Sequence, residues 1–121
     1  MAEGKEDRII TYEEIKTFEN SKDVLIIDVR EPDEIASTGK IGGSVNIPLG
    51  ELENSLKSLS DGEFQKKYNI PKPKPELPLV FSCRLGGRAE KAMHIALKQG
   101  YPNAKYYKGS WNEWQEKNKG K

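Results

Sequence analysis

The apolar residues of the chain fall into short runs that are separated by segments with helical spacing. Residues 24–27 form a continuous run, Val-Leu-Ile-Ile, which is typical of a strand buried on both faces in a parallel sheet. Similar short stretches predict further strands at 8–10, 44–47, 79–81 and 104–107. The sequence therefore predicts about five short strands.

The segments between these strands carry the signals of helices. Apolar side chains three and four positions apart predict helices near 49–58 and 89–97, each with one apolar face. Pro32 suits the first turn of a short helix over 32–36. Capping boxes, in which an N-cap residue and the residue three positions later hydrogen-bond to each other's backbone, predict three more helix starts, at Thr11 and Glu14, Ser60 and Glu63, and Ser110 and Glu113.

Strands that alternate with helices predict an α/β fold with a mostly parallel central sheet and helices on both faces. The 121 residues suffice for one domain over 1–121, with an ordered core over about 8–117 and flexible tails at 1–7 and 118–121. Four prolines within 71–78 predict an extended surface connector; the alternative is a proline motif that binds a partner.

Charge and composition restrict the classes of molecule that the protein is expected to bind. The 20 basic and 19 acidic side chains give a net charge of +1, which argues against nucleic acid or an anionic membrane as a partner. No apolar run approaches the ~18 residues that cross a bilayer, and residues 1–7 lack the features of a signal or transit peptide. A soluble cytoplasmic monomer is expected. A single cysteine, Cys83, excludes an internal disulfide and a Cys-x-x-Cys redox pair.

That cysteine opens a six-residue loop, 83–88, with the sequence Cys-Arg-Leu-Gly-Gly-Arg, between the fourth predicted strand and a helix. The amides at the start of that helix, together with Arg84 and Arg88, place positive charge around the sulfur. Gly86 and Gly87 allow a tight turn and a close approach. A thiol in this setting is expected to ionise easily and to meet an anion, so the loop indicates a nucleophile.

The sequence gives little support for catalysis by a histidine or for a metal site. The one histidine, His94, falls about two helical turns after the loop and is interpreted as an ordinary helix residue, so a Cys–His hydrolase dyad is disfavoured. One cysteine and one histidine at no ligand-like spacing predict no metal site, and no cofactor is indicated. The plainer alternative for Cys83 is a small buried hydrophobic residue; the flanking arginines and glycines weigh against it.

Four stretches resemble signatures of the rhodanese family, the thiosulfate sulfurtransferases, and they occur in the family's order. The loop resembles the active-site pattern Cys-Arg-x-Gly-x-Arg, and Asp28-Val29-Arg30-Glu31-Pro32-x-Glu34 resembles the first signature. Residues 39–48 resemble Gly-His-Ile-x-Gly-Ala-x-Asn-Ile-Pro, with Lys40 in place of the histidine. Gly109-Ser110-x-x-x-Trp114 resembles the closing Gly-Gly-x-x-x-Trp, with Ser110 in place of the second glycine.

The resemblance implies a single rhodanese-like domain, most like the branch that passes sulfur to glutathione, and no cofactor. Cys83 would take the outer sulfur of thiosulfate as a persulfide and pass it to glutathione, a thioredoxin-like thiol or cyanide in a ping-pong cycle. The donor and the persulfide would be held by Arg84, Leu85, Gly86, Gly87 and Arg88. Asp28 and Arg30 would support the loop, or form a buried ion pair with no catalytic part.

Two other functions stay open at this point. Cell-cycle-type dual-specificity phosphatases and arsenate reductases share the fold, but their Cys-x5-Arg loop surrounds a tetrahedral oxyanion. Here four residues separate Cys83 from Arg88, which favours a cradle for a single sulfur. The other alternative is a non-catalytic binding or sulfur-relay module in which Cys83 carries sulfur to a protein partner. Trp114 is expected to pack in the core, and Trp111 to pack or to line the pocket rim.

Overall fold

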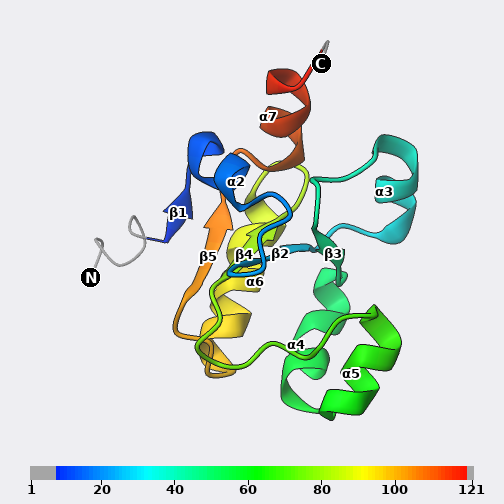
Figure 1. The fold of residues 1–121 in the computed structure, drawn as a ribbon. Helices are drawn as coiled ribbons and strands as arrows, with labels where there is room; N and C mark the ends of the chain where they lie inside the picture. Colours follow the sequence, from blue (N-terminus) through cyan, green and yellow to red (C-terminus); the bar gives the residue numbers. More distant parts are fainter. Residues whose placement is uncertain (1–7, 120–121) are drawn as a thin grey trace.

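Five parallel strands form one sheet at the centre of the molecule (Figure 1). The structure, a computed structural model, describes residues 8–119. The strands lie in the order β1-β5-β4-β2-β3, and each neighbouring pair is parallel. Their bounds are β1 Ile9–Ile10, β2 Leu25–Asp28, β3 Val45–Asn46, β4 Leu79–Ser82 and β5 Ala104–Tyr107. The predicted α/β fold with a parallel sheet of about five strands is therefore confirmed.

Helices follow the strands along the chain, as predicted. Their bounds are α2 Tyr12–Phe18, α3 Pro32–Thr38, α4 Leu49–Lys57, α5 Asp61–Tyr68, α6 Gly87–Lys98 and α7 Ser110–Lys117. Capping boxes open α2 at Thr11 and α5 at Ser60, which confirms two of the three that the sequence predicts. The helix predicted over 32–36 extends two residues further, to Thr38.

Two apolar cores lie on the two faces of the sheet, because side chains alternate across each strand. Ile27 and Phe81 point into the larger core, which also takes buried side chains from α4, α5 and α6. Their strand neighbours Ile26 and Val80 point into the smaller core, with side chains from α2 and α7. Trp114 is buried in this smaller core, as expected. Helices therefore cover both faces of the sheet (Figure 1).

The predicted third capping box, at Ser110 and Glu113, is wrong. Ser110 is the first residue of α7, its φ is +52°, and the N-cap position belongs to Gly109. The Ser110 hydroxyl instead donates to the Tyr107 carbonyl at 2.8 Å, and Glu113 accepts a hydrogen bond of 2.7 Å from the Tyr107 hydroxyl. Both polar side chains have partners before the helix, so neither caps its first turn.

The proline-rich segment 71–78 contains no helix or strand and crosses the amino ends of the strands (Figure 1). Hydrogen bonds hold it at several points: the Tyr101 hydroxyl donates to the Pro73 carbonyl at 2.8 Å, Lys72 Nζ to the Leu59 carbonyl at 2.7 Å, and the Asn103 amide to the Glu76 carbonyl at 2.9 Å. The extended connector predicted from the prolines is confirmed.

Earlier in the chain, Lys40 donates to the Ser44 carbonyl at 3.0 Å and so closes the turn before β3.

The predicted tails at 1–7 and 120–121 lie outside the described residues. Asn118 falls in the tail predicted at 118–121, but it donates to the Trp114 carbonyl at 2.8 Å and to the Tyr12 hydroxyl at 3.2 Å, so its side chain is held in place. Within residues 8–119, no helix is both long enough and apolar enough to cross a bilayer.

Candidate active site

Cys83 lies one residue beyond the carboxyl end of β4, at the edge of the sheet where parallel α/β proteins bind ligands. Its side chain is buried, with 1% of its surface exposed. The backbone N–H of Gly86 donates to Cys83 Sγ, with 2.9 Å between nitrogen and sulfur. The loop thus places a hydrogen-bond donor on the sulfur, as the sequence predicts. That further amides of 84–88 hold a bound persulfide stays a prediction.

The turn before α7 fixes the backbone of this loop. Ser110 Oγ accepts the Cys83 N–H at 3.0 Å, while the N–H of Trp111 donates to the Cys83 carbonyl at 2.9 Å. One residue further, the N–H of Asn112 donates to the Arg84 carbonyl at 3.0 Å. The buried hydroxyl of Ser110 also lies 3.8 Å from Cys83 Sγ. These contacts join two segments about 27 residues apart in sequence and leave the loop little freedom.

The two glycines of the loop differ in what they permit. Gly86 has a φ of +108°, and a methyl group there would lie 2.5 Å from the Lys108 carbonyl oxygen. Only glycine adopts this conformation at this close approach without strain. A methyl group on Gly87, which is the first residue of α6, would meet no atom within 4 Å. The tight turn therefore depends on Gly86 alone.

Arg88 on the first turn of α6 is held by a carboxylate from a distant helix. Its guanidinium forms two hydrogen bonds with Glu34 of α3, at 2.7 Å and 3.0 Å. Glu34 Oε1 also accepts the Glu31 N–H at 2.9 Å, so the carboxylate is itself oriented by the start of its helix. Glu34 lies within one of the signatures, but the sequence does not predict this pair, because no local pattern links positions 54 residues apart.

Electrostatics reinforce this pair. The Arg88 guanidinium lowers the pKa of Glu34 from 4.5 to about 2, and the Glu31 amide and the Arg30 charge act in the same direction. In turn, pairing with Glu34 raises the pKa of Arg88, with smaller contributions from the Cys83 and Asp28 charges. Arg88 therefore carries a permanent positive charge in the electrostatic neighbourhood of Cys83.

A buried ion pair supports the neighbouring strand end. Asp28, opposite Ser82 in the register of β2 and β4, accepts three hydrogen bonds of 2.8–3.1 Å from the Arg30 guanidinium. Arg30 is 1% exposed; it also donates to Thr38 Oγ1 and to the Gly39 carbonyl. Its guanidinium carbon lies 5.0 Å from the ring centre of half-buried Trp111. The two residues predicted to support the loop thus join β2, α3 and α7.

The remaining loop side chains face solvent. Arg84 is exposed, and Leu85, with 68% of its surface exposed, is the one large hydrophobic side chain that stands out from residues 8–119. His94 is exposed on α6. Among the described residues, no three His, Cys, Asp or Glu side chains gather as metal ligands would.

Comparison with known proteins decides the family. The sequence profile of the rhodanese-like domain matches residues 5–117. The chain belongs to the rhodanese family. The resemblance carried by the four signatures is therefore confirmed.

Individual rhodaneses resemble this chain over most of its length. A Drosophila melanogaster rhodanese domain-containing protein is 48% identical over 107 residues, which cover 88% of this chain and 96% of that protein. The human thiosulfate:glutathione sulfurtransferase is 38% identical over 89% of this chain and 93% of its own length. The solved structure of the human single-domain sulfurtransferase TSTD1 matches with a TM-score of 0.84 at 37% identity, covering 91% of this chain and 96% of that one.

The difference between the two loop glycines of this rhodanese is testable. Gly86→Ala should lower the free energy of unfolding by about 1–3 kcal/mol from backbone strain alone, because alanine is strained at φ +108°. The contact of its methyl group with the Lys108 carbonyl should add to this loss. Gly87→Ala is the matched control. It should change stability by less than about 1 kcal/mol, toward greater stability, because alanine favours the helix. Urea unfolding of both variants measures this, and equal losses would contradict the assignment.

The Glu34–Arg88 pair predicts a pH dependence of stability. Because the folded-state pKa of Glu34 lies below its unfolded value, the pair stabilises the protein above about pH 4.5 and this contribution disappears as the pH falls toward 2. Both side chains are about one-third exposed, so the contribution is worth about 1 kcal/mol or less. Wild type should exceed Glu34→Gln in unfolding free energy at neutral pH, with the difference shrinking in acid.

The matched control for this measurement is Glu53→Gln, which removes an exposed carboxylate from α4. Its difference from wild type should stay small throughout. A Glu34→Gln difference that is the same in acid as at neutral pH would show that the ion pair contributes nothing.

Proposed function

We propose that this protein is a thiosulfate sulfurtransferase that transfers sulfur through a persulfide on Cys83. The observation that carries the proposal is the hydrogen bond of 2.9 Å from the Gly86 N–H to Cys83 Sγ, at the carboxyl end of β4, with Arg88 fixed beside the loop by Glu34. Relatives named thiosulfate:glutathione sulfurtransferase, from human and Saccharomyces cerevisiae, support thiosulfate as the donor and glutathione as the acceptor.

In the first half-reaction the Cys83 thiolate attacks the outer sulfur of thiosulfate. A new S–S bond forms, the S–S bond of thiosulfate breaks, and sulfite leaves with the electron pair. Thiosulfate is a dianion, so the cationic side chains of Arg84 and Arg88 are suited to attract it. The persulfide that remains bears one negative charge on its outer sulfur, which backbone N–H groups of the loop would stabilise.

In the second half-reaction an acceptor thiolate such as glutathione attacks that outer sulfur. The acceptor leaves as a persulfide, and Cys83 is regenerated as a thiolate. The persulfide also eases access, since an S–S bond moves the reacting sulfur about 2 Å beyond the buried Cys83 Sγ. With one cysteine in the chain, no internal thiol can resolve the persulfide, so the acceptor must come from outside.

Steady-state sulfite release tests this proposal. With thiosulfate varied at several glutathione concentrations, the double-reciprocal lines should be parallel, as for a ping-pong enzyme. Cys83→Ser should release no sulfite, and full activity in that variant would overturn the mechanism. Thioredoxin and cyanide are compared as acceptors. A single burst of sulfite without turnover on any acceptor would instead favour a sulfur relay to a protein partner.

A second prediction concerns the donor. Arg88→Ala should lower kcat/KM for thiosulfate by about 10-fold to 100-fold, because it removes a charge-assisted contact worth about 1.5–3 kcal/mol. The kinetic constant for the acceptor should change less. Lys98→Ala, which removes an exposed cation from the far end of α6, is the matched control.

Arg88→Ala also leaves Glu34 without its partner, so the variant is repeated in a Glu34→Gln background. The same loss there identifies lost attraction rather than repulsion by the unpaired carboxylate. Reduced thermal stability with unchanged thiosulfate kinetics would show that Arg88 serves the fold and not the donor. Monomeric state and cytoplasmic location stay predictions.

A further inference from the structure

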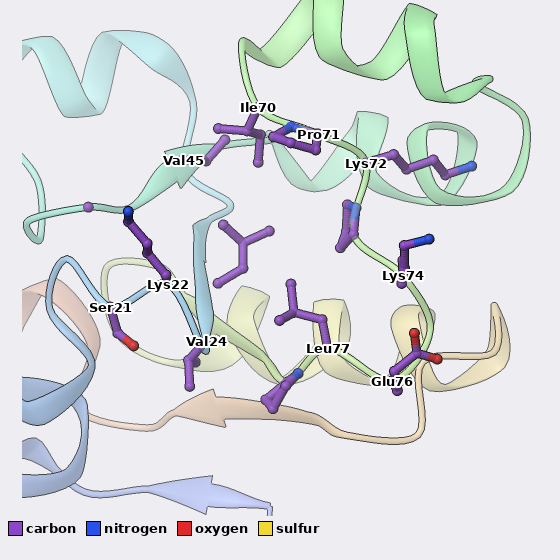
Figure 2. A pocket seen from close by; sticks show the side chains of 14 residues that line it. Ser21, Lys22, Val24, Val45, Ile70, Pro71, Lys72, Lys74, Glu76 and Leu77 are labelled. Atoms are coloured by element: carbon purple, nitrogen blue, oxygen red, sulfur yellow. The ribbon is translucent and has the colours of Figure 1, made fainter.

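An open pocket lies at the edge of the sheet opposite Cys83. Its volume is about 780 Å³, and it forms between the amino ends of β2 and β3 and the connector 70–78 (Figure 2). β4 separates it from the active-site loop, and this strand of four residues spans about 13 Å. Pockets of this size are typical of sites for small organic molecules.

The walls of the pocket are apolar. Val45, Ile70 and Leu77 pack against the larger core and line the pocket with partly exposed side chains (Figure 2). Leu25, which is also partly exposed, packs and lines the pocket in the same way. Val24 adds a fifth half-buried hydrophobic side chain from the start of β2. Water in contact with such walls is readily displaced by the apolar body of a ligand.

Cationic side chains surround these walls. Lys22 and Lys74 are exposed at the pocket, and within the described part of the chain neither ammonium group has a hydrogen bond or an ion pair. Lys72 lies beside Lys74 on the connector, with its ammonium group on the Leu59 carbonyl, and Lys22 lies across the opening from both (Figure 2). Glu76 is the one carboxylate among the described lining residues. Three lysines against one glutamate make this opening more positive than the protein as a whole, whose net charge is +1.

The backbone around the pocket disfavours an extended peptide as the occupant. Pro71, Pro73 and Pro78 have no N–H group to donate to a peptide. The edge strand β3 has only two residues, which is too short to pair with an added strand. The concave apolar walls and the free lysines fit a compact ligand better.

We propose that this pocket binds a small amphipathic anion, with its apolar body against the walls and its carboxylate or sulfonate at Lys74, while Lys22 adds positive charge across the opening (Figure 2). The assignment follows from the charge complementarity and from the size of the pocket. It does not depend on the sulfurtransferase activity, because the pocket residues and the Cys83 loop lie at opposite ends of β4.

Octanoate is the probe, titrated into the isotopically labelled protein below its micelle concentration and followed by amide NMR. The signals of 21–25, 43–45 and the non-proline residues of 70–78 should shift, while those of 83–88 should not. Octan-1-ol, of the same length and uncharged, should bind more weakly. Lys74→Ala should weaken octanoate binding by about threefold to fivefold, and Lys22→Ala with Lys74→Ala by more, whereas Lys98→Ala should leave it unchanged.

Several results would overturn the proposal. These are absence of octanoate binding, shifts confined to the loop 83–88, equal binding of octanol and octanoate, or equal weakening by Lys98→Ala. Shifts of the pocket signals with protein concentration alone would assign the surface to a second copy of the chain. Sulfite release measured on the same variants keeps the two proposals separate, since loss of octanoate binding with normal turnover affects only this site.

Discussion

The attachment of the loop 83–88 to the turn before α7 is the constraint on which the site depends. Backbone hydrogen bonds and the Ser110 hydroxyl hold Cys83 and Arg84, and Gly86 passes within contact of the Lys108 carbonyl. The chain must therefore turn at Gly86, and this turn aims its N–H at Cys83 Sγ. Ser110 accepts a positive φ, which is costly for serine, and in that position it satisfies the buried Cys83 N–H and Tyr107 carbonyl.

Two ion pairs lie at the carboxyl edge of the sheet, and they differ in their exposure. The buried Asp28–Arg30 pair is fully enclosed and compensates its own desolvation through additional hydrogen bonds to Thr38 and Gly39. The Glu34–Arg88 pair is partly exposed and keeps its cation beside the loop. The first pair fixes β2 to α3, and the second fixes α3 to α6. Helix α3 has no buried residue of its own, so these polar contacts do much to position it.

Local signals in the sequence predict most of the fold. The strands, the helix starts at Thr11 and Ser60, and the loop that begins at Cys83 all follow from short-range patterns, and the signature order identifies the family. Local patterns fail at residues whose hydrogen-bond partner is distant in the sequence. Ser110 looks like an N-cap, but its hydroxyl accepts the Cys83 N–H. Glu34 lies within a signature, but no local pattern predicts that it holds Arg88. Of the two adjacent glycines, only the structure distinguishes the one that the turn requires.

The central claim is that Cys83 carries sulfur as a covalent persulfide. Intact-protein mass spectrometry after brief treatment with thiosulfate, without any acceptor, tests it most directly. The account predicts that the wild-type protein gains the mass of one sulfur atom, that peptide analysis locates it on Cys83, and that added glutathione removes it. An unchanged mass, a gain elsewhere in the chain, or the same gain in Cys83→Ser would contradict it.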